Sequence, residues 1–386
     1  MRVSHVITRL IVGGAQENTV ATVLGLLRKP GVEVELISGL SSRSEGTLER
    51  AFDPYPGTLR IFPSLVRQVH PWHDAVATFQ LARRYRATRP EIVHTHSGKA
   101  GFVGRLAAKL AGIRLIIHTI HGPSFGAFQG AGKNCAYKNS ERFAGHCTTH
   151  FISVAQAMTD QYVSAGIGRP EQYTRIFSGF PLEPFLGVRR SREVRAKLGL
   201  SETDFVIAKV ARLFELKGHD DLFDAAPAIV EAIPAARFLL IGDGPSRQHF
   251  ERRAAVAKLE GRFHFAGLVP PSEMPAYFSA ADAAVHLSFR EGLPRAVSQA
   301  LAAAVPVVAY DCDGTSEVCL DGQTGFLIAK GDLPALADRL AKLARDASLR
   351  ERFGAAGRNF VREHFSEQKM VDDIFSLYKR LLGPDG

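Results

Sequence analysis

The sequence predicts an α/β protein made of two doubly wound units, each with a parallel sheet between layers of helices. Short β-branched runs alternate with helical patterns of about 10 to 15 residues along the whole chain, which is typical of βαβ units. The 386 residues, of which 46% are apolar and 23% charged, are too many for one compact core. Two domains, each with its own core, are therefore expected.

The expected strands fall into two groups of similar size, separated by a proline-containing linker. The strands of the first group are 2–8, 32–37, 91–94, 114–119 and 151–154, and those of the second are 205–210, 237–241, 262–265, 283–287 and 306–310. Pro181 and Pro184 lie in a stretch with little periodicity, and a new helix is expected near Ser191. The predicted domains are therefore 1–182 and 183–365, followed by an amphipathic C-terminal helix within 366–386.

The net charge of +9 is concentrated in the first half of the chain. Residues 1–182 contain 21 Lys and Arg against 11 Asp and Glu, whereas the remainder contains 27 against 28. A basic lobe suits nucleic acid, an anionic membrane surface or a phosphorylated acceptor. Nucleic acid is not expected, because no nucleic-acid-binding motif accompanies the charge. Part of the excess lies in Arg83, Arg84, Arg86 and Arg89, where a solvated helix end is an equally good interpretation.

Cysteine usage and hydropathy exclude several classes of protein. Cys135, Cys147, Cys312 and Cys319 lack the spacing of a zinc site and are too few for a disulfide framework, so buried reduced thiols are expected. No run of about 18 apolar residues occurs, and Arg9 interrupts the first apolar stretch. These observations predict a cytoplasmic protein that does not span a membrane.

A pair of cations follows the first strand of the second group. Arg212 and Lys217 lie just beyond the carboxyl end of that strand, which is where ligands bind in open α/β sheets. Two cations at this edge suit a diphosphate, whose charge they stabilise as it leaves. A solvated pair of side chains is the alternative interpretation.

The most informative stretch runs from the strand 283–287 into the turn Glu291-Gly292-Leu293-Pro294 and then a helix that contains Gln299. A carboxylate beside a helix N-terminus accepts hydrogen bonds from sugar hydroxyls, and the free amides bind phosphate or hydroxyl oxygens. Pro294 is expected at the first helical position, which suits its missing donor. A Glu that only caps the helix is the alternative.

Two glycine turns also end predicted strands. Gly13 and Gly14 precede the first helix, and Gly242 and Gly244 follow the strand 237–241. Glycine turns of this kind let backbone amides approach an anion, although tight turns use such pairs for purely structural reasons. A nicotinamide-binding fingerprint is not expected at Gly242, because the third glycine is missing.

Together these motifs resemble the family 4 retaining glycosyltransferases of the GT-B fold. The resemblance rests on Gly13-Gly14-Ala15, Thr119-Ile120-His121-Gly122, Arg212 with Lys217-Gly218, Gly242-Asp243-Gly244-Pro245, Glu291-Gly292-Leu293-Pro294 and Gly314-Thr315-Ser316-Glu317. It spans residues 3 to about 365. The resemblance implies two facing Rossmann-like domains with a cleft between them, and a C-terminal helix that packs back on the first domain.

The resemblance also implies a role for each motif residue. Gly14 approaches the donor phosphates, His121 lies beside the transferred sugar, Arg212 and Lys217 bind the diphosphate, and Glu291 holds sugar hydroxyls. Backbone near Leu268 and Val269 meets the base, and Gln299 stands where the family usually has a ribose-binding Glu. An amide bonds the ribose without charge assistance, so weaker nucleotide binding is expected. Ala211 and Ala304 stand where glycine is common. Their methyl groups should slightly narrow the space in which the backbone can be approached closely.

The function implied is retaining transfer of a sugar from a nucleoside diphosphate sugar, UDP or GDP, to an acceptor hydroxyl in glycan, glycolipid or polysaccharide biosynthesis. No metal and no other cofactor is expected: Asp311-Cys312-Asp313 resembles the metal motif of another glycosyltransferase class, but Arg212 and Lys217 already supply positive charge. A nucleotide-sugar epimerase or hydrolase and a non-catalytic sugar-nucleotide binder remain alternatives.

The acceptor is least constrained by the sequence. Residues 123–134 are glycine-rich and carry Phe125 and Phe128, which indicates a mobile loop suited to cover an acceptor or touch a membrane. With the basic first half, this suits a lipid-linked or otherwise anionic acceptor and peripheral contact with the inner membrane face, while a glycan or a small molecule remains an alternative acceptor.

Overall fold

The computed structural model describes residues 1–41, 46–126 and 128–383 and divides the chain into two units. The first unit comprises Met1–Phe180 together with Glu367–Gly386, and the second comprises Pro181–Ser366. The chain therefore leaves the first unit two residues before the predicted boundary at 182 and re-enters it at Glu367. No helix among the described residues is long and apolar enough to cross a membrane.

The first unit is built on a parallel sheet of seven strands in the order β3-β2-β1-β4-β5-β6-β7. The order reverses between β1 and β4, which makes the sheet doubly wound. Its strands are β1 (Arg2–Ile7), β2 (Glu33–Ser38), β3 (Leu59–Ile61), β4 (Ile92–His96), β5 (Leu115–Ile120), β6 (His150–Ser153) and β7 (Tyr173–Arg175).

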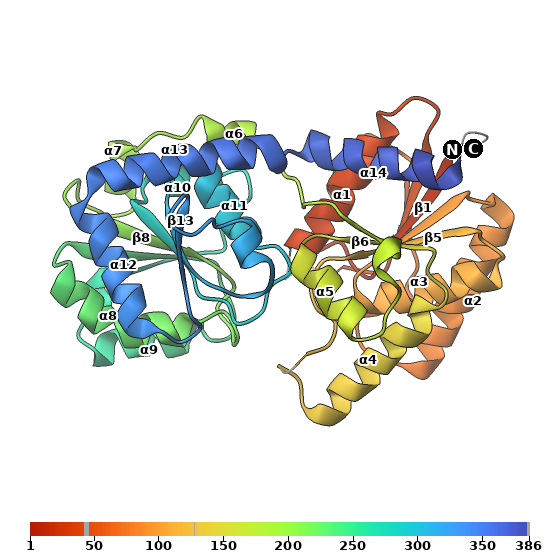
Figure 1. Ribbon diagram of the computed structural model, residues 1–386, viewed down its shortest axis with the longest axis horizontal. Coiled ribbons are helices and arrows are strands. Elements are labelled where there is room, and N and C mark those ends of the chain that lie inside the picture. The colour runs from red at the N-terminus through yellow and green to blue at the C-terminus, as the bar shows by residue number, and fades with distance from the viewer. Residues whose placement is uncertain (42–45, 127, 384–386) are drawn as a thin grey trace. The chain divides into compact units, whose positions relative to one another are not determined.

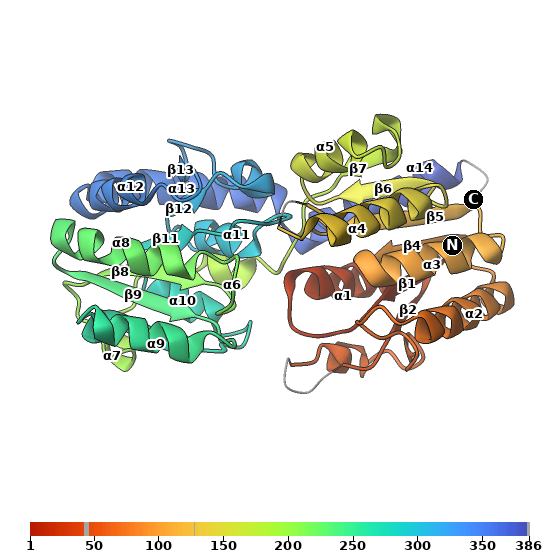
Figure 2. The same ribbon diagram turned by 90° about the horizontal axis from the view of Figure 1, so that it is seen from below.

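Helices cover both faces of this sheet (Figure 1). The helices are α1 (Gly14–Leu27), α2 (Pro71–Thr88), α3 (Gly98–Leu110), α4 (Ala131–Gly145), α5 (Gln156–Ser164) and α14 (Glu367–Leu382). Helices α1 and α14 bury their apolar side chains in one core, and α2 and α3 bury theirs in the core on the other face. Figure 2 shows α2, α3 and α4 side by side across that second face.

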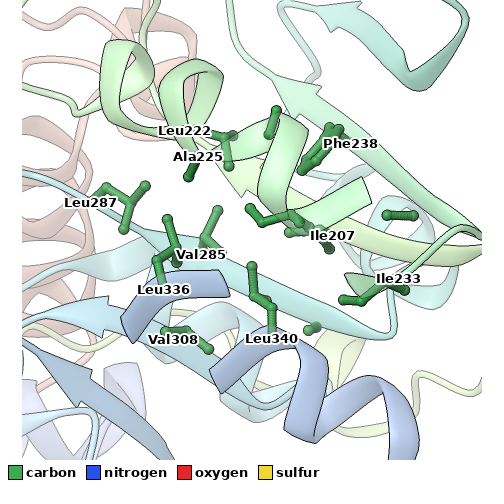
Figure 3. Close-up of a cluster of buried hydrophobic side chains, with 14 of the residues drawn as sticks. Ile207, Leu222, Ala225, Ile233, Phe238, Val285, Leu287, Val308, Leu336 and Leu340 are labelled. Carbon is green, nitrogen blue, oxygen red and sulfur yellow. The ribbon is translucent and has the colours of Figure 1, made fainter. Parts of the chain in front are cut away.

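The second unit contains a parallel sheet of six strands in the order β10-β9-β8-β11-β12-β13. Its elements are β8 (Phe205–Val210), β9 (Ala236–Ile241), β10 (Phe263–Gly267), β11 (Ala283–His286), β12 (Val307–Tyr310), β13 (Gly325–Ile328), α6 (Glu183–Leu186), α7 (Arg192–Lys197), α8 (His219–Ala232), α9 (Arg247–Val256), α10 (Met274–Ser279), α11 (Arg295–Ala302), α12 (Leu333–Arg345) and α13 (Ala347–His364). The switch point lies between β8 and β11. Figure 3 shows Ile207, Val285 and Val308 of the sheet meeting Leu222 of α8 and Leu336 of α12 in the core.

The ten predicted strands are present, with ends within two residues of the predicted ones. The sequence did not reveal β3, β7 and β13, which have three, three and four residues and lie at the edges of their sheets. Strands this short carry too few alternations to be distinguished from loops.

Helix α14 packs on α1 through a close contact at Gly25. The Met370, Val371, Ile374, Leu377 and Tyr378 side chains of α14 are buried in the core beneath α1. A Cβ atom added to Gly25 would lie 2.4 Å from a methyl carbon of Val371. The missing side chain of Gly25 therefore sets how closely the two helices approach.

Gly25→Ala is expected to destabilise the protein by about 1–3 kcal/mol, because the stiff Val371 side chain has to move out of a packed core. Urea unfolding measures the change in the free energy of unfolding. Gly132→Ala is the matched control: Gly132 is also helical, but an added Cβ meets nothing within 4 Å, so neutral or slightly increased stability is expected. Equal effects of the two changes would contradict this account of the α1–α14 contact.

Candidate active site

The loop after β8 holds Lys217 against the end of β11. Gly218 adopts φ +61°, and a Cβ atom there would lie 1.9 Å from the carbonyl oxygen of Leu287, so only glycine allows this approach. The amide of Phe289 donates to the carbonyl of Leu216 over 2.9 Å. These backbone contacts bring Lys217 to the turn that follows β11.

Lys217 and Glu291 form an ion pair of 2.6 Å between Nζ and Oε1, with 24% and 15% of their side chains exposed. His286 Nε2 lies 3.2 Å from the same carboxylate oxygen. Burial alone would raise the pKa of Glu291, but His286 and Lys217 outweigh burial and hold it well below its ordinary value. Glu291 is therefore a carboxylate throughout the physiological pH range.

Asp313 fixes the backbone of the same turn. Its Oδ2 accepts a hydrogen bond of 2.7 Å from the amide of Glu291. The preceding Cys312 is buried, and the Asp-Cys-Asp stretch leads into a short 3₁₀ helix at Asp313–Glu317. Asp313 thus has a structural partner within the protein.

Lys209, near the end of β8, contributes a further amine, which the charges of Lys217 and Glu291 influence. It is only 2% exposed, and burial together with the neighbouring Lys217 lowers its pKa to about 7. His219, the first residue of α8, contacts the carbonyl of Arg212 through Nε2 over 3.0 Å. Burial and Lys209 lower the pKa of His219 to about 3, so its imidazole is neutral.

Arg212 lies in the same loop as Lys217, and its side chain is exposed. Its guanidinium carbon lies 5.6 Å from the centre of the Phe214 ring. The Arg212 loop is tied to the loop after β9, because Leu213 donates to the carbonyl of Asp243 over 3.1 Å. The two loops therefore form one surface at the carboxyl ends of β8 and β9.

Gly242 and Gly244 allow the loops after β8 and β9 to pack closely together. Cβ atoms at these positions would lie 2.2 Å and 2.4 Å from the carbonyl oxygens of Ala211 and Leu213. Gly242 also donates to the carbonyl of Gly267, the last residue of β10, over 2.9 Å. Leu268, 65% exposed, and the buried Val269 follow directly, next to this surface.

The turn before α11 differs from the prediction in one respect. Pro294 is the N-cap and is extended, with φ −75° and ψ 101°, so the helix begins at Arg295 rather than at Pro294. The buried Gly292 and half-buried Leu293 precede it, and Gln299 is half-buried within the helix. The shift moves the helix N-terminus one residue further from Glu291.

The expected residues of the first unit lie at the ends of β1 and β5. Gly13 is the N-cap of α1 and Gly14 its first residue. A Cβ atom on Gly14 would meet nothing within 4 Å, so packing within the protein does not require glycine there. His121 follows β5, and desolvation lowers its pKa to about 4.

His121 is the end of a group of hydrogen-bonded histidines that the sequence analysis did not single out. His121 Nε2 lies 3.0 Å from His96 Nδ1, and His96 Nε2 lies 2.9 Å from His5 Nδ1. His94 is the direct neighbour of His5 across the β1–β4 ladder. The signal in the sequence was the alternation His94-Thr95-His96, which places both imidazoles on one face of a strand.

Two further predictions need correction. Cys312 and Cys319 are buried, but Cys135 is exposed and Cys147 half-buried, because both lie in or next to the polar helix α4. The predicted loop 123–134 ends early, since α4 begins at Ala131; Ala127 lies outside the described residues. Phe125 is 4% exposed and packs against Tyr162, so it is not available to cover an acceptor.

Two family models match the chain, and together they cover most of it. The model described as Glycosyltransferase Family 4 matches residues 12–183, and the one described as Glycosyl transferases group 1 matches residues 190–360. The chain belongs to the family 4 glycosyltransferases. The two matches correspond to the two Rossmann-like units, as the GT-B fold requires.

Two relatives match over most of their length. One is a UDP-Gal:alpha-D-GlcNAc-diphosphoundecaprenol alpha-1,3-galactosyltransferase of Escherichia coli, 29% identical over 320 residues, which are 82% of each chain. The other is the capsular polysaccharide biosynthesis glycosyltransferase CapM of Staphylococcus aureus, 24% identical over 92% of each chain.

Solved structures share the fold at lower identity. HepE of Anabaena, crystallised with UDP, has a TM-score of 0.81 and 20% identity over 98% of this chain and 99% of its own. A sucrose-phosphate synthase of Thermosynechococcus elongatus also has a TM-score of 0.81, with 19% identity over 99% of each chain. This family 4 glycosyltransferase thus has the predicted GT-B fold.

Sequence reasoning placed Lys217 and Glu291 beside the strand ends but missed the groups that support them. His286 and Lys209 lie within strands and resemble ordinary sheet residues, and Asp313 was considered only as part of a metal motif. The common signal was a titratable side chain at or near the carboxyl end of a buried strand.

The buried histidines of the first unit predict acid sensitivity. His5, His94, His96 and His118 are at most 1% exposed. Burial lowers the pKa of His5 to about 3 and the pKa values of the other three well below 6.5, with the nearby Arg105 adding to the effect at His118. Each is neutral in the folded protein at pH 5, whereas it is protonated in the unfolded chain.

Stability should therefore be complete above pH 6.5 and fall as the pH decreases toward 5, because the unfolded state then binds more protons. His5 alone accounts for about 2 kcal/mol at pH 5. Urea unfolding between pH 8 and pH 5 measures the slope, and His5→Phe should reduce it by about one proton. Gly132→Ala, which changes no titratable group, is the control and should leave the slope unchanged. A slope unaffected by His5→Phe would show that this imidazole titrates normally.

Proposed function

We propose that this glycosyltransferase transfers a sugar from a UDP-sugar to a lipid-linked acceptor, with retention of the anomeric configuration and without a metal ion. The observation that carries the proposal is the Lys217–Glu291 pair at the carboxyl ends of β8 and β11, anchored by His286 and Asp313. Such an arrangement offers a cation to a diphosphate and a carboxylate to sugar hydroxyls in one place.

Lys217 and Arg212 stabilise the leaving group. When the bond between the anomeric carbon and the phosphate oxygen breaks, the electron pair stays on that oxygen and the diphosphate gains negative charge. Fixed cations at this point lower the barrier more than mobile ones, because they need no reorganisation. Lys217 is already fixed by its bond to Glu291.

Glu291 has one oxygen available for the sugar. Lys217 and His286 both lie against Oε1, and among the described residues no hydrogen bond or ion pair reaches Oε2. Oε2 therefore accepts hydrogen bonds from hydroxyls of the transferred sugar, while the amides of Gly292 and Leu293 lie next along the turn. Leu268 and Val269 meet the base, and Gln299 bonds the ribose.

Retention follows when the acceptor attacks the face from which the diphosphate departs, and the departing phosphate accepts the acceptor's proton. Glu291 is a poor nucleophile for an alternative double displacement, because Lys217 and His286 stabilise its charge. This supports a mechanism without a covalent sugar–enzyme intermediate.

The donor and acceptor classes are supported by the relatives. The Escherichia coli relative is named for UDP-Gal and a diphosphoundecaprenol-linked sugar, and HepE was crystallised with UDP. The excess of Lys and Arg over residues 1–182 suits an acceptor that carries a diphosphate in an anionic membrane surface. The protein then acts at the cytoplasmic face of that membrane.

Arg212→Ala and Lys217→Ala are each expected to reduce the rate of transfer on the order of 10²-fold or more, because each removes a fixed charge from the leaving diphosphate. The donor is first chosen by thermal shift with UDP-, GDP- and ADP-sugars, of which a UDP-sugar should raise the melting temperature. Arg352→Ala, at an exposed position of α13, is the control and should retain the wild-type rate.

Full turnover in both site variants would disprove this assignment of the cations. Product analysis by NMR separates the remaining functions. Donor consumed without any acceptor would indicate an epimerase or hydrolase, and donor bound without turnover by any acceptor would indicate a binding protein.

The metal-independent mechanism predicts different effects for the two aspartates of Asp311-Cys312-Asp313. Asp313→Ala should weaken donor binding about tenfold, because the Glu291 amide loses its partner. Asp311→Ala, at an exposed residue, should bind donor normally. Calorimetry measures donor binding by both variants. A chelator should leave the rate of sugar transfer unchanged. Equal losses in the two variants together with inhibition by the chelator would instead indicate a metal site.

A further inference from the structure

A chain of hydrogen-bonded side chains runs through the core of the first unit. It begins at Thr119 in β5 and ends at His121, just after the same strand. Its members in order are Thr119 Oγ1, His94, the hydroxyl of Tyr378, His5, His96 and His121. The donor–acceptor distances are 2.6 Å for Thr119–His94, 3.4 Å for Tyr378–His5, 2.9 Å for His5–His96 and 3.0 Å for His96–His121, and Tyr378 also contacts His94. Tyr378 comes from α14, at the far end of the sequence.

Every member of this chain is neutral, so each imidazole has one donor nitrogen and one acceptor nitrogen. Burial lowers the pKa of each histidine and raises that of Tyr378. In a chain of neutral imidazoles, the choice of tautomer at one ring determines the tautomer of the next, because two donors or two acceptors cannot face each other. Two directions are therefore available to the whole chain.

Tyr378 selects between these directions. A phenol hydroxyl is a stronger acid than a neutral imidazole N–H, and Tyr378 lies closer to His94 Nδ1 than to His5 Nε2. The Tyr378 hydroxyl therefore donates its hydrogen bond to His94 Nδ1. His5 Nε2–H then donates to the phenol oxygen, and its Nδ1 accepts from His96.

The remaining steps lead to His121. His96 donates through Nε2–H to His5, so its Nδ1 is an acceptor. His121 must then donate through Nε2–H to His96 Nδ1. In this direction Nδ1 of His121 carries no proton, so its lone pair can accept a hydrogen bond.

We propose that Tyr378 is a positioning residue for transfer, which through His5 and His96 holds His121 in the Nε2–H tautomer and keeps its Nδ1 as a hydrogen-bond acceptor for a hydroxyl of the transferred sugar. The proposal rests on the proposed function and on the place beside the transferred sugar that the family resemblance implies for His121. A reversed chain would put a proton on Nδ1 and replace the acceptor by a donor.

The tautomer of His121 can be read directly in the unliganded protein. Long-range ¹H–¹⁵N correlation spectra of the full chain with ¹⁵N-labelled histidine distinguish the protonated from the unprotonated ring nitrogen, and His121→Asn identifies the signal. The wild type should show His121 as the Nε2–H form alone at pH 8. Tyr378→Phe removes the hydroxyl and keeps the ring, and should give a mixture of both tautomers.

Controls separate positioning from packing. Tyr85→Phe changes another fully buried tyrosine of the same unit, in α2 on the other face of the sheet, and should leave the His121 tautomer unchanged. If Tyr378→Phe folds poorly, His5→Phe interrupts the chain at a second point and should give the same mixture. A wild-type His121 in the Nδ1–H form, or a tautomer unaffected by both variants, would overturn the proposal.

The kinetic consequence is tested in a double-mutant cycle. Tyr378→Phe should lower kcat/KM for the donor about threefold to tenfold, which is the effect of one hydrogen bond to the transferred sugar. In the His121→Ala background the same change should have no effect, because Tyr378 acts only through His121. An equal loss in both backgrounds would overturn the positioning role. The spectra are recorded without turnover. They therefore test the hydrogen-bonded chain even if the proposed function is wrong.

Discussion

The active surface of the second unit depends on the half-buried ion pair between Lys217 and Glu291. Burying a charge partly away from water destabilises the folded protein unless an opposite charge stays beside it. Loss of one partner leaves the charge of the other uncompensated. The loops that carry these residues must therefore be fixed relative to each other. Gly218 allows the loop after β8 to touch Leu287, and Asp313 holds the amide of Glu291. The rigidity of the site follows from this requirement.

Much of the fold and part of the site could be predicted because both depend on local patterns. Buried parallel strands are short apolar runs, and the residues just beyond them, such as Arg212 and Lys217, are adjacent to them in the sequence. The partners of these residues are not. Asp313 contacts the Glu291 amide across 22 residues, and His5 contacts His96 across 91. Such contacts arise only when the sheet brings distant strands together.

Pro294 and Ala304 lie at the two ends of α11, and at both the backbone conformation differs from what residue type alone suggests. Pro294 caps α11 in an extended conformation, where its fixed φ is as acceptable as in the first turn. Ala304 follows the end of the same helix at φ +59°, where glycine is usual. Its cost therefore includes backbone strain at a helix end. Neither conformation is determined by residue type alone, because the neighbouring packing decides it.

The histidines of the first unit are difficult to explain by stability. Replacing both partners of a buried hydrogen bond by apolar groups of similar shape is often neutral, so a core of leucine and phenylalanine would serve packing equally well. Instead His5, His94 and His96 occupy the centre of the sheet and become a liability in acid, as their lowered pKa values require. Their hydrogen bonds give the reason: Tyr378 links His94 to His5, His5 contacts His96, and the series ends at His121. A chain with that direction and that end transmits the choice made at Tyr378, which isolated core histidines cannot do.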